Sequence, residues 1–195
     1  MTNKFVNIFT IMLIVLIYTI YNENKNNDLI YVESEKDGRK YLVRNLPDKN
    51  DAANLMSNLR ENLVTIRDYL ESNNSKESRV KRLLQKFNPN NIMENKKGSK
   101  YTSYSINKGE KVVFCMRSKD NRQELIDINT MMFVALHELS HIMTASIGHT
   151  EEFWKNFKYL LQLAVSLGIY KKVDYSVNPQ QYCGMKVTDS PLINK

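Results

Sequence analysis

Residues 134–154 read VALHELSHIMTASIGHTEEFW, and this stretch decides the fold that we predict. It holds all 3 histidines of the 195-residue chain. His137, Glu138 and His141 form an H-E-x-x-H motif. Residues four apart lie on one face of a helix, so both imidazoles can bind one metal ion. Glu138 lies about 100° farther around the axis, where it can hold a water molecule beside the metal.

The residues around this motif carry no charge, which indicates a buried helix. They are Val134, Ala135, Leu136, Leu139, Ser140, Ile142 and Met143. H-E-x-x-H also occurs by chance in unrelated helices. Here, however, Glu138 would be a buried carboxylate, which is costly unless it has a partner, and metal-bound water is such a partner. The stretch therefore predicts a zinc site, because zinc binds imidazole and leaves a position open for water in catalytic sites.

The third zinc ligand is predicted to be His149. It follows Gly148, a residue type that suits the left-handed conformation just past a helix end. It lies eight residues after His141, a longer gap than the six of H-E-x-x-H-x-x-G-x-x-H. Glu151 and Glu152 are rival ligands. Both follow Thr150, a good N-cap, and acidic groups there favour the helix dipole without any metal.

The N-terminal residues 5–22 are uncharged, and as a helix they would extend roughly 27 Å, close to the hydrocarbon thickness of a bilayer. Residues 1–22 contain no Ala, Gly or Ser, so a small-residue cleavage site is missing. We therefore expect an N-terminal membrane anchor at 1–22, a linker at 23–28 and one domain at 29–195. Basic residues are more frequent after the anchor than before it, which favours a cytosolic domain.

The remainder of the chain predicts an α+β domain. Its sheet is expected to be small, antiparallel or mixed, and packed on the H-E-x-x-H helix and on other helices. The expected elements are hairpins at 29–44 and 101–117, a helix from about Pro47 to Glu71, a polar loop at 88–100 and a helix after Thr150 that stops at Gly168. The run VVFCM, from Val112 to Met116, is either a strand that lines the substrate cleft or an ordinary central strand.

The tail and the overall charge leave several alternatives open. Tyr182 could donate a hydrogen bond to a developing oxyanion, and Met185 could lie under the site, although aromatic residues in a tail more often pack. Cys115 and Cys183 could pair, but nothing in the sequence demands it. The net charge of +7 is compatible with nucleic acid or an anionic membrane surface as a partner, or with a solvated basic surface.

Together the segments VVFCMR, FVALHELSHIMTASIGHTEEFW and YCGM resemble the WLM-type metallopeptidase domain. The likeness is greatest to the small forms encoded by nucleocytoplasmic large DNA viruses, and it is specific over residues 129–160. The family pattern falls on His137, Glu138, His141 and His149, with a longer gap before the third histidine than in cellular members. The resemblance implies a zincin-like fold, one zinc and proteolysis. Cellular members of the family are implicated in removing proteins crosslinked to DNA, but this chain has no recognisable DNA-binding or ubiquitin-like-modifier-binding extension.

The predicted function is hydrolysis of peptide bonds in a protein or peptide substrate. His137, His141 and His149 would hold zinc, and Glu138 would act as general base. One alternative is a membrane-tethered zinc protein without catalysis, in which Cys183 could complete a four-ligand structural site. The other is a basic nucleic-acid-binding protein in which the histidines are incidental, although no nucleic-acid-binding motif supports it.

Overall fold

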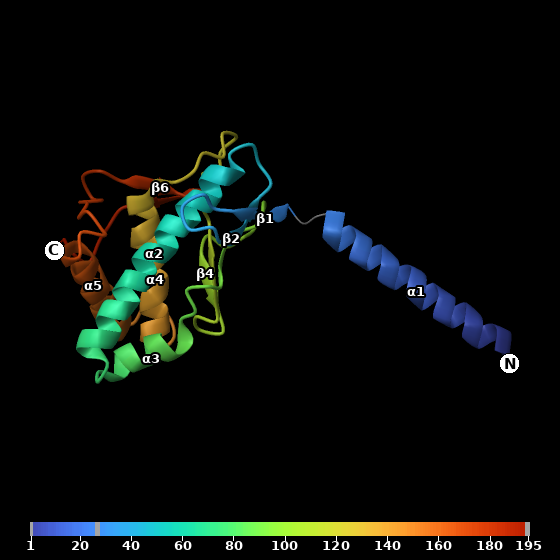
Figure 1. Cartoon of the computed structure of the whole chain (residues 1–195), viewed down its shortest axis with the longest axis horizontal. Helices are drawn as coiled ribbons and strands as arrows, with labels where there is room; N and C mark the ends of the chain where they lie inside the picture. Colours follow the sequence, from blue (N-terminus) through green and yellow to red (C-terminus); the bar gives the residue numbers. More distant parts are fainter. Residues whose placement is uncertain (1, 26–27, 194–195) are drawn as a thin grey trace.

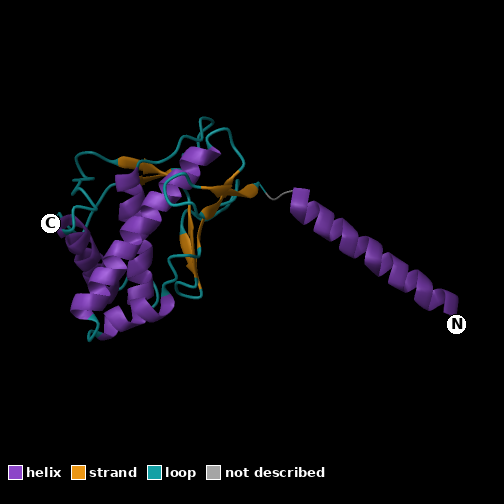
Figure 2. Ribbon diagram, viewed as in Figure 1, coloured by secondary structure: helices purple, strands orange, loops and turns teal. Residues whose placement is uncertain are grey.

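The computed structural model describes residues 2–25 and 28–193, and Figures 1 and 2 show the arrangement of its elements. The helices are α1 (Thr2–Lys25), α2 (Lys49–Asn74), α3 (Ser78–Lys86), α4 (Ile128–Met143) and α5 (Glu151–Ser166). The strands are β1 (Leu29–Glu33), β2 (Lys40–Arg44), β3 (Ile92–Glu94), β4 (Tyr104–Ile106), β5 (Lys111–Phe114), β6 (Gln180–Tyr182) and β7 (Met185–Val187). The predicted α+β class is confirmed.

Over the described ranges, the main sheet has the strand order β1-β2-β3-β5-β4. β1 pairs with β2 and β4 pairs with β5 in antiparallel hairpins, as predicted. β3 joins the two hairpins by parallel pairing to β2 and β5. The sheet is therefore mixed. β4 lies at its edge, whereas β5, which contains most of the VVFCM run, lies inside the sheet.

The H-E-x-x-H helix, α4, is the most enclosed helix of the domain. Twelve of its 16 residues are buried, including Glu138 at 7% exposure. It packs against α2, α3 and α5. Its start is set by Asp127, whose carboxylate accepts a hydrogen bond from the Thr130 backbone N–H at 3.0 Å. The uncharged flanks of the motif therefore form part of the core, as the sequence indicated.

Two other helices bring the sheet and α4 together. The predicted apolar stripe of α2 is buried, and this helix contacts both the sheet and α4. α2 runs on to Asn74, three residues beyond the predicted end at Glu71. The apolar face of α5 packs on α4 through Phe153 and Phe157, which are both fully buried or nearly so. Figure 2 shows that most of the helices lie on one side of the main sheet.

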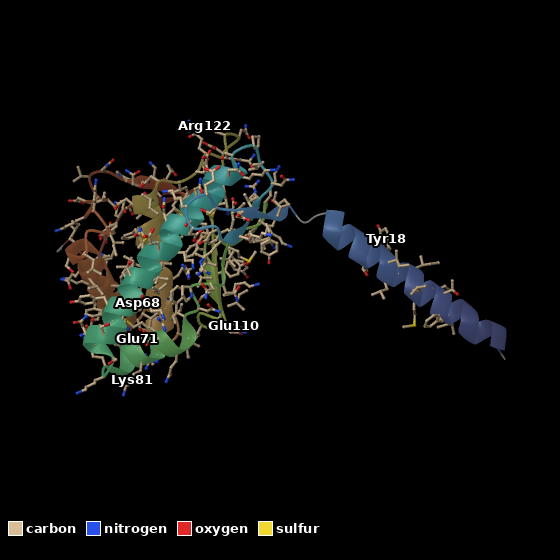
Figure 3. The ribbon with its side chains drawn as sticks, viewed as in Figure 1. Tyr18, Asp68, Glu71, Lys81, Glu110 and Arg122 are labelled. Carbon is tan, nitrogen blue, oxygen red and sulfur yellow. A yellow bond between two sulfur atoms is a disulfide. The ribbon has the colours of Figure 1, made fainter. Side chains whose placement is uncertain are left out.

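α1 covers the segment predicted to be a membrane anchor. Figure 1 shows this helix apart from the other elements, and Tyr18, at 64% exposure, extends away from it (Figure 3). No helix within residues 2–25 and 28–193 is long and apolar enough to cross a membrane. The predictions of a transmembrane helix and of a membrane localisation are wrong.

The structure changes the predicted linker and leaves the predicted domain boundary untested. α1 continues to Lys25, so it overlaps the first part of the linker expected at residues 23–28. Residues 26 and 27 lie outside the described ranges. The domain expected at 29–195 stays a prediction, and its last two residues also lie outside the described ranges.

Three strands were not predicted from the sequence. β3 lies within the stretch 88–100 that was expected to be a polar loop. β6 and β7 form a second, separate sheet in the tail. A disulfide between Cys115 and Cys183, with Cα atoms 6.2 Å apart, attaches this tail hairpin to the chain just after β5. Cys115 and Cys183 therefore do pair, which the sequence had left open.

Candidate metal centre

The three histidines of the chain converge at one point. The Nε2 atom of His137 lies 3.2 Å from that of His141 and 3.1 Å from that of His149. One ring nitrogen from each residue lies within 4.8 Å of those of the other two. His137 and His141 meet because they are one helical turn apart on α4. His149 reaches them from the linker that follows the helix, where Gly148 has a φ of +86°.

One aromatic side chain from α5 supports all three imidazoles. The Phe153 ring centroid lies 4.9 Å from that of His137, 4.3 Å from that of His141 and 4.7 Å from that of His149. Thr150 begins α5, because its side chain accepts a hydrogen bond from the Phe153 backbone N–H. The predicted N-cap thus orients the helix that carries this supporting ring.

The electrostatic environment keeps the two helical imidazoles neutral. Burial lowers the pKa of His137 to about 3, with further lowering by the charges of His141 and His149. Burial also lowers the pKa of His141 to about 4, and the charge of His149 adds to it. A neutral imidazole has a free lone pair, which a metal ion needs. The cluster is therefore ready to hold a cation at neutral pH.

Glu138 lies beside this cluster in a low-dielectric environment. Burial raises the pKa of its carboxyl group to about 7. The side chain lines the same cavity as the three histidines. A carboxyl group with a pKa near neutrality can both accept and return a proton at physiological pH.

The cavity has a volume of about 840 Å³ and lies between α4, the edge strand β4 and the tail. Most of its remaining wall is apolar or aromatic. The lining residues beyond the four named above are Thr102, Ser103, Tyr104, Ser105, Phe133, Val134, Trp154, Phe157, Tyr182, Met185, Val187, Thr188, Asp189, Ser190, Pro191 and Ile193. Because β4 rather than β5 borders the cavity, the VVFCM run forms a central strand, which was one of the two readings of the sequence.

Tyr182 is buried at 2% exposure and lines this cavity. Its hydroxyl lies 2.5 Å from the Ser103 hydroxyl, which also accepts a hydrogen bond from the Cys115 backbone N–H at 3.1 Å. Burial raises the pKa of Tyr182, and the negative charge of Glu138 raises it further. The hydroxyl therefore keeps its proton. Ser103 was not singled out from the sequence, because its partner Tyr182 is 79 positions away.

Among the described residues, the group that could hold a metal ion consists of the three histidines without the other candidates. Cys183 is in the disulfide and has no thiolate to offer as a fourth ligand. Glu151 forms an ion pair with Lys155 at 2.7 Å, and Glu152 accepts hydrogen bonds from the linker before α5. Met185 lies in the cavity wall at 50% exposure.

A comparison with protein families identifies the domain that contains this site. The WLM domain matches residues 35–190. The chain belongs to the WLM domain family. This WLM protein is 34% identical over 191 residues to an uncharacterized protein of Acanthamoeba polyphaga mimivirus, covering 96% of each chain. It is 36% identical over 103 residues to an uncharacterized protein of Invertebrate iridescent virus 6, covering 52% of this chain and 56% of that relative.

Solved structures similar to this WLM protein include two of Wss1 from Saccharomyces cerevisiae. One has a TM-score of 0.46 at 19% identity and covers 63% of this chain and 85% of that chain. The other, a mutant, has a TM-score of 0.49 at 18% identity and covers 66% of this chain and 91% of that chain. The predicted resemblance to WLM proteins of viruses is confirmed by the family match and the viral relatives. The WLM protein therefore has the fold of a metalloprotease family.

Proposed function

We propose that this protein is a zinc-dependent metallopeptidase with a zincin-like site. The observation that carries this proposal is the convergence of three histidine nitrogens within 4.8 Å at a cavity that Glu138 also lines. A structural role for the cluster has less support, because Cys183 is in a disulfide and cannot complete a closed four-ligand site.

The donor set and its spacing fit zinc. Zinc binds imidazole nitrogens at about 2.0–2.1 Å in tetrahedral geometry, which places two such nitrogens roughly 3.3 Å apart. The observed Nε2 separations of 3.2 and 3.1 Å agree with this value. His137, His141 and His149 would be the three protein ligands, an arrangement typical of catalytic sites.

Glu138 is proposed to be the general base. When bound, zinc supplies a Lewis acid that polarises the scissile carbonyl and activates a water molecule. The Glu138 carboxylate accepts a proton from this water molecule and later returns it to the leaving amine. Its pKa of about 7 suits both transfers near neutral pH. The position after His137 turns the carboxylate away from the ligand set while keeping it in the same cavity.

Tyr182 is proposed to stabilise the negative charge that develops on the substrate carbonyl oxygen. It lines the cavity, and its raised pKa keeps the hydroxyl available as a hydrogen-bond donor. Ser103 would hold this hydroxyl in place through the 2.5 Å contact between the two oxygens. The disulfide next to Tyr182 attaches its hairpin to the main sheet.

The proposed substrate is a protein or peptide bound in an extended conformation. β4 is the edge strand of the main sheet, and an edge strand has backbone groups that can pair with an added chain. Residues 102–105 line the cavity directly. Among the described residues that line it there are many apolar and aromatic side chains and no lysine or arginine. Apolar side chains next to the scissile bond would therefore be preferred.

The test combines metal analysis with a protease assay on the full chain, wild type against Glu138→Gln. Wild type should contain about one zinc per chain and cleave an unfolded protein substrate. Glu138→Gln should keep its zinc and lose activity by about 10²–10⁴-fold, because general base catalysis contributes that much. Glu151→Gln provides a matched control, since it makes the same change at a residue that pairs only with Lys155 on the surface. Full activity of Glu138→Gln, or wild type that binds zinc without cleaving any protein, would contradict the proposal.

A further inference from the structure

The linker that presents His149 has little apolar packing of its own. It leaves α4 at Thr144 and runs through Ala145, Ile147 and Gly148, all three of which are exposed, with Ile147 at 88%. His149 itself is exposed, whereas the pair on α4 is partly buried. Apart from its ring contact with Phe153, the third imidazole therefore has little burial to hold it, and polar contacts of the linker must contribute.

A carboxylate from the first turn of α5 binds this linker. Glu152 accepts hydrogen bonds from the backbone N–H of Ala145 at 3.0 Å and from that of Ser146 at 3.3 Å. It also accepts one from the Ser146 hydroxyl at 3.0 Å. Two backbone donors and one side-chain donor thus converge on one side chain, which lies three residues after His149. Hydrogen bonds to a charged acceptor are stronger than neutral ones.

Two cations from other elements complete the set of contacts. Arg82, on α3, donates a hydrogen bond to the Met143 carbonyl and lies 3.6 Å from the Glu152 carboxylate. Lys108, in the turn between β4 and β5, donates to the Ala145 carbonyl at 3.1 Å. Figure 1 shows α3 next to the C-terminal end of α4, where cations are favoured by the helix dipole. Charged groups from three elements therefore hold a linker that apolar packing leaves free.

We propose that Glu152 is a positioning residue, which together with Arg82 holds the linker 144–149 so that His149 is in place before a metal ion arrives. This inference rests on the proposed zinc site. Without these contacts the linker would lose conformational entropy when His149 binds the metal, and the affinity would fall. Loss of a group that orients a ligand typically lowers metal affinity by 10–100-fold.

The decisive comparison is Glu152→Gln against Glu151→Gln in the full chain. Both changes remove one negative charge from the first turn of α5, so they alter the helix dipole interaction equally. In Glu152→Gln one carboxylate oxygen becomes an NH₂ group, which is itself a donor. The side chain then cannot accept all three hydrogen bonds from the linker. Zinc affinity, measured by competition with a chelating dye, should fall by about 10–100-fold in Glu152→Gln and remain unchanged in Glu151→Gln.

A second readout separates positioning from general destabilisation. With Co²⁺ in place of zinc, the visible absorption spectrum reports the number and geometry of the ligands. Glu152→Gln should alter this spectrum toward that of His149→Ala, while thermal unfolding of the metal-free protein should stay close to that of Glu151→Gln. If Glu152→Gln does not fold, Ser146→Ala removes one of the three hydrogen bonds and should lower the zinc affinity by severalfold.

A double-mutant cycle tests whether Glu152 acts through His149. In the His149→Ala background, Glu152→Gln should cause no further loss of metal affinity. An equal loss in both backgrounds, or zinc binding by Glu152→Gln that matches wild type, would overturn the inference and leave the zinc site intact. Wild type that fails to bind zinc would instead overturn the proposed function.

Discussion

The candidate site has two halves that are built in different ways. One half is α4, which carries His137, Glu138 and His141 within five consecutive positions of a helix that is mostly buried. The other half comes from the chain beyond this helix, where His149 lies in an exposed linker and Tyr182 in a small hairpin. The first half is held by helix geometry and the core. The second half is held by hydrogen bonds, ion pairs and a disulfide.

This difference determines how each half should respond to change. A substitution in the core around α4 alters the whole domain, because the helix packs against three others. A substitution among the polar contacts of the second half should move one functional group and leave the fold in place.

The largest expected effect on stability comes from the disulfide in the second half. Cys183→Ser removes a bond between residues 68 positions apart. Closure of a loop of this length in the unfolded chain corresponds to about 4 kcal/mol of stability. The free energy of unfolding, measured with denaturant in non-reducing buffer, should fall by about this amount. Reductant should lower the wild type to the level of the variant and leave the variant unchanged. Wild type that does not respond to reductant would show that the bond contributes nothing.

The second effect is a pH dependence in the first half, measured on metal-free protein. Burial raises the pKa of Glu138 from 4.5 to about 7, so the folded state holds a proton that the unfolded state releases between these values. The stability contributed by this proton is present below pH 4.5 and is lost as the pH rises through 7. Glu138→Gln has no such loss. Its free energy of unfolding should therefore rise by about 2–3 kcal/mol relative to that of wild type between pH 5 and pH 8.

Both proteins are unfolded with denaturant at pH 5 and at pH 8, with a metal chelator present throughout. The free energies of unfolding of wild type and Glu138→Gln are then compared at each pH. The contributions of His137 and His141 are present in both proteins and cancel in the comparison. A constant difference in unfolding free energy between wild type and Glu138→Gln across this range would mean that the carboxyl group of Glu138 is not shifted by burial.

The smallest effect concerns the hydroxyl of Tyr182. Tyr182→Phe should lower kcat by about tenfold, because the lost hydrogen bond would stabilise the transition state by about 1.4 kcal/mol. Zinc content and KM should be unchanged. Ser103→Ala is the comparison variant, because it removes the 2.5 Å contact that would position the tyrosine hydroxyl but keeps the hydroxyl itself. An equal loss in Ser103→Ala would assign the effect to the contact between these residues, and no loss in Tyr182→Phe would exclude the hydroxyl from catalysis.

Local sequence signals predicted the first half well. The four-residue spacing of His137 and His141 placed both on one face, and the uncharged flanks predicted burial of α4. The N-cap role of Thr150 and both hairpins of the main sheet were also predicted. In each case the signal and the structure involve residues close together in the chain, so backbone geometry alone relates one to the other.

Contacts between distant residues could not be predicted in this way. The partner of Ser103 is 79 positions away, and the two cysteines are 68 apart. Glu152 was predicted to be an acidic residue in the first turn of a helix, and it is. Its contacts with the linker were not predicted, because they depend on the angle at which α5 follows α4. The predicted membrane anchor was wrong: residues 5–22 carry no charge, but none of the described helices is long and apolar enough to span a bilayer.

The sequence by itself predicted the candidate ligand pair and the candidate general base, because one helical turn brings His137 and His141 together and places Glu138 beside them. Only the tertiary structure decided how His149, Tyr182 and the edge strand β4 meet at the same cavity. The physical reason is that a helix repeats every 3.6 residues whatever surrounds it, whereas the path of a linker or a tail depends on the elements that it contacts.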